Sequence, residues 1–372
     1  MIPYGKQSID IDDIQSVIDV LKSNFITTGP KIAEFEKVIC DFTDAKFAVA
    51  VSSGTAALHS AIFATGINEG DEVIVPTMTF AATANAILYQ RGKPVFVDVL
   101  PENLLINPDE VRKKITSKTK AIIAVDYAGH PCDYSELRKI CNEYGLKLIA
   151  DACHSLGAMY TGRKVGTLAD ITCFSFHPVK HITTGEGGMA LTDNKEYADK
   201  MRVFRNHGIT TDYRQREEKG AWFYEMEHLG FNYRITDFQC ALGISQVKKL
   251  PLWIKRRQEI ALYYDCAFKD NSSIVPLRKL LNVFHAYHLY VVKLTNSDRD
   301  EVFAKMRKSG IGVNVHYIPV HLHPYYRKQL RTSEGLCPVA EQAYKQIISL
   351  PIFPGLENGD LDLVIKTLQQ EL

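Results

Sequence analysis

The sequence predicts an α/β fold in which a mostly parallel sheet of seven strands lies between helices and is followed by a smaller α+β domain. Short apolar runs alternate with amphipathic helical patterns, which is typical of a parallel sheet covered on both faces. The length of 372 residues exceeds what one hydrophobic core normally serves. The pattern also changes after about Pro276. We therefore expect a large domain over residues 1–250, and a linker helix with a small domain over residues 251–372.

The large domain is expected to begin with a helix. Apolar residues recur at helical spacing from Ile11 to Leu21, behind Asp10 as a possible cap. Amphipathic patterns such as Ser135–Tyr144 predict helices between most of the strands that follow. Seven apolar runs predict these strands, at Phe47–Val51, Glu72–Val75, Pro94–Val99, Ala121–Val125, Leu146–Ala150, Ile171–Phe176 and Met189–Thr192.

The remaining elements are expected to form the linker and the small domain. Phe238–Phe268 shows a long helical pattern, which we expect to break at Pro251 because proline cannot continue the hydrogen bonding of a helix. Further patterns predict strands at His285–Leu294 and Ile311–Val315, and helices at Ser297–Ser309 and Leu361–Leu372.

Lys180 is the most informative residue of the chain. It follows the apolar run that ends at Phe176 and precedes the glycine-rich stretch Gly185–Gly188. An amine surrounded by protein has a lowered pKa and can act as a neutral nucleophile toward an aldehyde cofactor. An isolated lysine in such a place would by default be a solvated loop residue, so the interpretation depends on its companions.

Asp151 is the second candidate, at the carboxyl end of the predicted strand Leu146–Ala150. Ligands of open α/β sheets bind at this edge. A carboxylate there can pair with a protonated pyridine nitrogen, as in pyridoxal 5′-phosphate (PLP) enzymes. The alternative role is a helix N-cap. His154 could contact the cofactor or satisfy a local hydrogen bond.

Two further segments complete the predicted cofactor site. Gly54 and Thr55 lie where a strand gives way to a helix, and the free N–H groups of a new helix attract phosphate. Ser175 could add a hydroxyl to the same phosphate. Phe80 could stack on a planar ring. Each signal is weak alone, because many helices begin with such residues and a lone Phe is more often part of the core.

In this order the segments resemble the DegT/DnrJ/EryC1/StrS sugar aminotransferases, which are PLP enzymes of fold type I. The resemblance runs from the first residues to beyond residue 320. It rests on Ser53-Gly54-Thr55, Pro76 to Phe80, Asp151 to His154, Ser175 to Gly188, Asn206-His207-Gly208 and Gly230-Phe231-Asn232-Tyr233-Arg234.

The resemblance implies a role for each cofactor residue. Lys180 would bond to PLP and shuttle the proton, and Asp151 would pair with the pyridine nitrogen. The phosphate would be held by Gly54, Thr55 and Ser175, with Phe80 over the ring. Asn232 would reach the phosphate of the neighbouring subunit's cofactor, so a homodimer with shared active sites is expected. A lysine at position 180 favours amino transfer over the deoxygenation that relatives with histidine catalyse.

Within the family, the chain is similar to the transaminases of pseudaminic acid biosynthesis. The resemblance lies in Val125–Gly129, Ala241–Lys249 and Val315–Pro319. It implies L-glutamate as amino donor and C4 of a UDP-linked 4-keto-6-deoxy-L-altrose derivative as acceptor. Substrate-binding residues are expected at Tyr4, Asn24, Phe25, Ile26, Thr27, Asn314, His316 and Tyr317.

Composition limits the other possibilities. A net charge of +1 gives no electrostatic reason to expect binding to nucleic acid or a membrane. The eight cysteines are scattered without a Cys-x-x-Cys pair, which favours reduced thiols. With no basic-then-apolar leader and no membrane-length apolar run, the expected location is the cytoplasm. We expect no metal site, because His321 and His323 have no acidic or thiol partner nearby.

Three alternatives stay open at this point. The nearest is an aminotransferase for another 4-keto sugar, of the perosamine or bacillosamine type, because it would share every cofactor residue. Cysteine desulfurases and aldolase-like lyases share the fold, but no cysteine lies in an exposed glycine- or serine-rich loop. A non-catalytic regulator on the same fold is the remote alternative.

Overall fold

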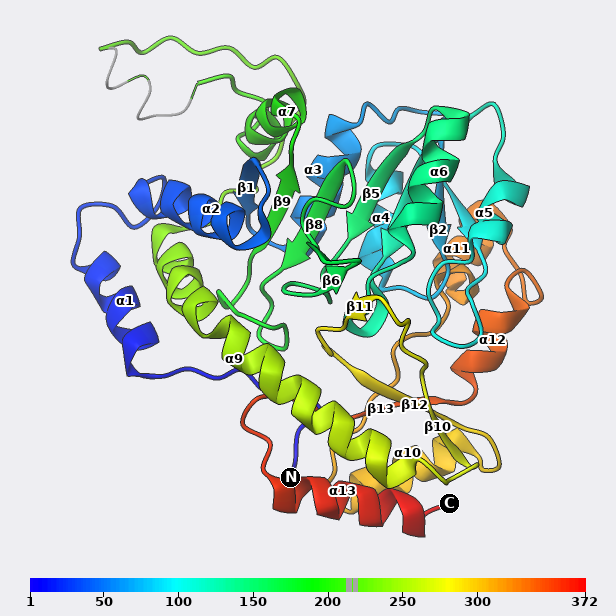
Figure 1. The fold of residues 1–372 in the computed structure, drawn as a ribbon. Coiled ribbons are helices and arrows are strands. Elements are labelled where there is room, and N and C mark those ends of the chain that lie inside the picture. Colours follow the sequence, from blue (N-terminus) through cyan, green and yellow to red (C-terminus); the bar gives the residue numbers. More distant parts are fainter. Residues whose placement is uncertain (212–215, 217–219) are drawn as a thin grey trace.

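The computed structural model describes residues 1–211, 216 and 220–372 and contains a large and a small lobe (Figure 1). A seven-stranded sheet forms the centre of the large lobe, in the order β1-β9-β8-β5-β4-β2-β3. All neighbours in it are parallel except β9, which runs antiparallel to β1 and β8. The strands are β1 (Phe47–Val51), β2 (Glu72–Pro76), β3 (Lys93–Val97), β4 (Thr119–Val125), β5 (Lys147–Asp151), β8 (Ile171–Ser175) and β9 (Gly188–Thr192).

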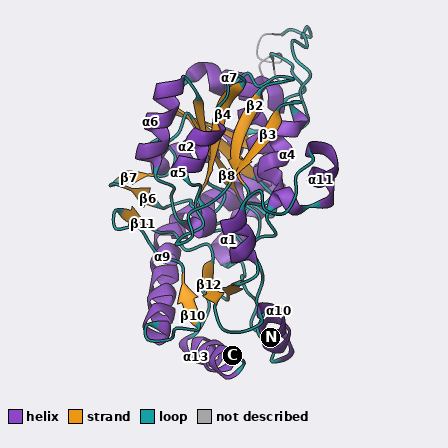
Figure 2. Ribbon diagram, turned by 90° about the vertical axis from the view of Figure 1, so that its right-hand side faces the viewer, coloured by secondary structure: helices purple, strands orange, loops and turns teal. Residues whose placement is uncertain are grey.

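The predicted α/β fold is therefore confirmed, and the seven apolar runs form the seven strands with ends that differ by at most two residues. Most strand residues are buried, because helices cover both faces of the sheet (Figure 2). The helices packed against it are α2 (Pro30–Thr43), α3 (Gly54–Ala64), α4 (Ala81–Tyr89), α5 (Pro108–Lys114), α6 (Tyr134–Tyr144) and α7 (Lys195–Arg205).

Helix α1 (Ile11–Leu21) begins at its predicted cap. The Asp10 side chain accepts from the N–H groups of Asp12 and Asp13, and the Asp13 carboxylate accepts from the N–H of Asp10. This reciprocal arrangement satisfies backbone donors that a helix start leaves without partners.

The long helix α9 (Asp237–Phe268) joins the lobes and corrects one prediction, because it continues through Pro251. Residues up to Ile254 pack into the core of the large lobe, and residues from Ile260 pack into that of the small lobe. Pro251 lies on an exposed face and cannot donate to the carbonyl four residues earlier in the helix. Packing at both ends therefore outweighs the lost bond. The predicted domain boundary between residues 250 and 251 falls inside this helix and stays a prediction.

The small lobe is α+β. Its sheet has the order β10-β12-β13, and helices α10 and α13 share its hydrophobic cluster. Both chain ends lie at this lobe (Figure 1). Its elements are β10 (Ile274–Pro276), β12 (Tyr290–Leu294), α10 (Arg299–Lys308), β13 (Ile347–Leu350) and α13 (Asn358–Gln370). Helices α11 (Pro324–Leu330) and α12 (Pro338–Tyr344) lie between α10 and β13 in the sequence but pack against the large lobe, where Tyr326 bonds to Asn85 and the N–H of Val339 donates to Asp98. Where the two lobes meet, a small sheet contains β6 (Met159–Tyr160), β7 (Arg163–Lys164) and β11 (Val283–Phe284).

Two predicted strands differ from the structure. His285–Leu294 is regular only from Tyr290, because Ala286 and Leu289 donate instead to carbonyls of the large lobe. Ile311–Val315 forms no strand; it makes single bridges from Ile311 to Ile2 and from Asn314 to Ser349. In both segments, contacts with distant parts of the chain override the local pattern.

Within the described residues, no helix is long and apolar enough to cross a membrane.

Candidate active site

A cavity of about 470 Å³ opens where the carboxyl ends of the parallel strands meet the small lobe. Ligands of open α/β sheets bind at this edge. The cavity is lined by residues of both lobes and of the amino-terminal segment. Among the predicted site residues, those that line it are Tyr4, Gly54, Thr55, Phe80, Asp151, His154, Ser175, Lys180, Asn314, His316 and Tyr317.

Lys180 lies in a tight turn after β8, where its N–H donates to the carbonyl of His177 at 2.8 Å. Burial lowers the pKa of its amine, and the Cys153 thiol and the Asp151 carboxyl only partly oppose this effect. Within the described chain, no ion pair includes Lys180. The amine therefore loses its proton more readily than that of a surface lysine and is available as a nucleophile or a proton acceptor.

Asp151 is the last residue of β5 and is 6% exposed. Its Oδ2 accepts from the Thr83 hydroxyl at 2.6 Å, and its Oδ1 accepts from the Cys153 N–H at 3.3 Å. Turns rather than a helix follow it, so the alternative role as a helix N-cap does not apply. A carboxylate that is oriented on both oxygens keeps further lone pairs for a cationic partner in the cavity.

The first turn of α3 forms an anion cradle. The Ser53 side chain caps the helix by accepting from the Ala56 N–H at 3.1 Å. Among the described residues, the N–H groups of Gly54 and Thr55 have no acceptor. They point out of the helix start, where the helix dipole also favours an anion. Ser175, at the end of β8, lies against Gly54.

Aromatic side chains also line the cavity. The Tyr317 hydroxyl lies 3.1 Å from Nε2 of His154, and the Tyr317 ring lies 5.9 Å from that of Phe80. Phe80 is 59% exposed, so it is not a core residue. The ring of Tyr4 lies 5.5 Å from that of His316. Among the described residues, buried Nδ1 of His154 has no hydrogen-bond partner, and since such an atom is costly, it is available to a polar group of a ligand.

Side chains of the small lobe orient the predicted substrate residues. Nδ1 of His316 lies 2.8 Å from the Ser349 hydroxyl, and Nε2 of His316 lies 3.3 Å from the Asn314 amide nitrogen. Burial lowers the pKa of His316 to about 3, and Lys180 adds to this effect, so its imidazole is neutral near pH 7. A neutral imidazole can donate or accept a hydrogen bond without repelling the lysine.

The remaining predicted residues do not line this cavity. Asn24, Phe25, Ile26 and Thr27 are exposed between α1 and α2. There the carbonyl of Ile26 accepts from the N–H of Asp237 at 3.0 Å. Asn232 is also exposed, in a bridge with Asn206. Its predicted contact is with a second subunit, so it stays a prediction.

Sequence reasoning missed several residues of the cavity. His177 and Glu186 lie inside the motif around Lys180, whose spacing could have indicated them. His288 gave no local signal. Its ring lies 4.3 Å from that of His154, and burial lowers its pKa well below the usual range.

In the described part of the chain, no three His, Cys, Asp or Glu side chains are arranged to hold a metal ion.

The model of the DegT/DnrJ/EryC1/StrS aminotransferase family matches residues 7–369. The chain belongs to this family. It is 38% identical over 374 residues to the spore coat polysaccharide biosynthesis protein SpsC of Bacillus subtilis, and the alignment covers 99% of this chain and 96% of SpsC.

Solved structures agree with this assignment. The putative sugar aminotransferase Spr1654 of Streptococcus pneumoniae, in its PMP form, superposes with a TM-score of 0.94 and 32% identity, covering 100% of this chain and 98% of Spr1654. PseC of Helicobacter pylori, an aminotransferase involved in the biosynthesis of pseudoaminic acid, gives a TM-score of 0.93 and 32% identity with the same coverage. The chain is therefore a PLP-dependent sugar aminotransferase.

The cavity fits this cofactor. It offers a deprotonatable amine for an aldehyde, a carboxylate for a pyridine N–H, free amides beside a hydroxyl for a phosphate, and an unpartnered ring nitrogen of His154. When bound, PLP supplies an electron sink that stabilises negative charge on the carbon next to the transferred nitrogen.

The contact between Gly54 and Ser175 generates a prediction. A Cβ at position 54 would lie 2.8 Å from Cβ of Ser175 and 3.2 Å from Sγ of Cys153. The Ser175 Cβ cannot move without its backbone, so Gly54→Ala should displace α3 from β8. We expect the dissociation constant for PLP to rise at least about tenfold, measured by absorbance titration of the apoprotein.

Gly359→Ala is the matched control, because Gly359 also lies in the first turn of a helix and a Cβ there would meet nothing within 4 Å. It should bind PLP like the wild type. Equal PLP affinity in both variants, with both folded by circular dichroism, would show that the cradle does not hold the phosphate.

Proposed function

We propose that this enzyme transfers the amino group of L-glutamate to C4 of UDP-4-keto-6-deoxy-L-AltNAc, a UDP-linked 4-keto-6-deoxy-N-acetylhexosamine, for pseudaminic acid-type surface glycans. The observation that carries this proposal is the wall of Tyr4, Asn314, His316 and Tyr317 in the same cavity as Lys180. Full-length similarity to PseC supports the acceptor.

The similarity to a second relative favours another acceptor sugar. The chain is 38% identical to SpsC, a spore coat polysaccharide biosynthesis protein, and 32% identical to PseC. A different 4-keto-6-deoxy nucleotide sugar, of the perosamine or bacillosamine type, is therefore the alternative.

The proposed chemistry divides between a few side chains. Lys180 would hold the cofactor through its amine, and the same amine would move a proton at Cα of glutamate. Asp151 holds the pyridine nitrogen protonated, while Gly54, Thr55 and Ser175 fix the phosphate. Phe80 and His154 position the ring. The same groups serve both half-reactions, because the second is the reverse of the first with a ketosugar in place of 2-oxoglutarate.

We further propose a homodimer with shared active sites. The described parts of the segment after α7, residues 206–211 and 220–232, project from the large lobe (Figure 1). The described part of this segment exposes large apolar side chains, and clusters of this kind mark protein interfaces. The exposed residues are Trp222, Phe223, Tyr224, Met226, Leu229 and Phe231. A second copy would cover them and receive Asn232.

The cytoplasm is the proposed location, since all eight cysteines are free thiols.

The acceptor is tested by following the absorbance of the PLP form in two separate steps. L-glutamate should bleach the visible band of the purified holoenzyme, and UDP-4-keto-6-deoxy-L-AltNAc should restore it. If glutamate bleaches the band and only a D-configured 4-keto-6-deoxy sugar restores it, the alternative acceptor is correct. If no ketosugar restores the band, the proposed function is wrong.

Shared active sites are tested by subunit complementation. Lys180→Ala and Asn232→Ala should each be inactive or nearly so as pure proteins. After unfolding and refolding together in equal amounts, half the dimers are mixed and each has one intact site, so activity should reach about a quarter of the wild-type value.

A mixture of Lys180→Ala with Asp151→Asn is the control, because both changes fall in the same subunit's site. In mixed dimers each site keeps one defect, so no activity should return. If the Asn232 mixture behaves like this control, Asn232 does not act across an interface.

A further inference from the structure

The four residues Asp126–Gly129, which follow β4, contact each of the segments that form the back of the active-site cavity. These segments are Asp151–Ser155, Ala286–Leu289 and His316–Tyr317. We call Asp126–Gly129 the hub. No hub residue was predicted as a site residue, and none lines the cavity. The residue just before the hub, Val125, does line it.

The hub holds the segment that carries Asp151 and His154. The Asp126 N–H donates to the carbonyl of Asp151 at 3.1 Å. The Ser155 hydroxyl donates to Oδ2 of Asp126 at 2.6 Å. These bonds fix the backbone on both sides of His154, so the position of its ring depends on the hub.

The hub also holds the segment that carries His288. The N–H of Ala286 donates to the carbonyl of Gly129 at 3.0 Å, and that of Leu289 donates to Ala128 at 3.1 Å. Gly129 has a φ of 97°, and a Cβ there would lie 2.7 Å from the carbonyl oxygen of His154. Only glycine fits this approach.

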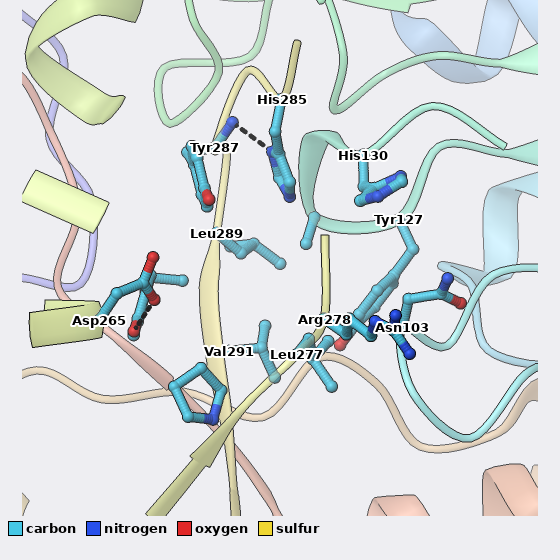
Figure 3. Close-up of a pocket in the computed structure, with 13 residues that line it drawn as sticks. Asn103, Tyr127, His130, Asp265, Leu277, Arg278, His285, Tyr287, Leu289 and Val291 are labelled. Carbon is cyan, nitrogen blue, oxygen red and sulfur yellow. Dashed lines mark hydrogen bonds between the residues drawn. The ribbon is translucent and has the colours of Figure 1, made fainter. Parts of the chain in front are cut away.

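The third contact is made by a side chain. The Tyr127 hydroxyl donates to the main-chain carbonyl of His316, and the Tyr127 ring is fully buried. Figure 3 shows Tyr127 beside a cavity at the junction of the lobes, with Leu289 and Val291 of the small lobe also lining it. This cavity of about 30 Å³ has room for one or two waters and no substrate. The hydroxyl bond of Tyr127 links this junction of the lobes to the carbonyl of His316.

We propose that Tyr127 is a positioning residue that holds the His316–Tyr317 wall at the geometry which the acceptor sugar requires. The inference rests on the proposed function, in which this wall binds the sugar. Tyr127 acts through the carbonyl of His316 and does not line the active-site cavity itself. The Tyr127 hydroxyl donates to His316 and reaches the residues proposed to bind the cofactor only indirectly, through Tyr317, whose hydroxyl lies 3.1 Å from Nε2 of His154. The reaction with the amino donor should therefore depend on it less than the reaction with the ketosugar.

The test compares Tyr127→Phe with Tyr264→Phe. Tyr264 is a matched control because it is also fully buried and donates to a main-chain carbonyl, that of Pro351 at 3.0 Å, in the core of the small lobe. Both variants leave one buried carbonyl without its donor and should lose similar stability in thermal unfolding.

Only Tyr127→Phe should change the positions of His316 and Tyr317. We expect its KM for the ketosugar to rise about tenfold, with kcat and the rate of bleaching by L-glutamate within about twofold of the wild type. Amide hydrogen exchange in the peptide covering residues 313–319 should be faster than in the wild type and in Tyr264→Phe.

The inference is overturned if exchange in residues 313–319 matches the Tyr264→Phe control. It is also overturned if the donor and acceptor reactions of Tyr127→Phe fall equally, since that indicates a general structural role. If the wild type accepts no ketosugar, the proposed function fails on its own, and the exchange experiment still decides whether Tyr127 positions the wall.

Discussion

The active site depends on holding one amine among protein groups at the carboxyl edge of a parallel sheet, where it is only partly exposed. A buried ammonium is costly, so burial lowers the pKa of Lys180 and makes a neutral amine accessible. The sheet topology places the other groups around it. Parallel strands β1, β2, β5 and β8 all end at this edge, and each is followed by a segment that enters the cavity. Antiparallel β9 then leads the chain away again.

The rest of the cavity depends on contact between the lobes. Tyr4 reaches the cavity because the amino-terminal segment pairs with the small lobe, where its carbonyl accepts from the Ile352 N–H at 3.0 Å. His316 is oriented by Ser349 of β13 and by Tyr127 of the large lobe. The groups proposed to hold the cofactor therefore belong mainly to the large lobe, and both lobes shape the proposed substrate wall. Variants that shift one lobe should change substrate selection before they change cofactor binding.

Whether a feature could be predicted from the sequence depends on how far apart in the chain its interacting residues lie. The strands could be predicted because buried parallel strands are continuous apolar runs, and Lys180 and Asp151 could be located because they follow such runs. His288 could not, since its place depends on carbonyls of Ala128 and Gly129 far away in the sequence. Pro251 was misjudged because packing of α9 on both cores was not visible locally. Asn24–Thr27 do not line the cavity, and the proposed role of Asn232 requires a second subunit, which a single chain does not supply.

The most direct test of the account asks which residue bonds to PLP. Holoenzyme treated with borohydride, which makes the bond between the amine and the cofactor permanent, should be digested and analysed by peptide mass spectrometry. The account predicts the phosphopyridoxyl group on Lys180 and its loss when L-glutamate is added before the borohydride. A label on another lysine, or a label that glutamate does not remove, would contradict the assignment of Lys180 as the catalytic amine.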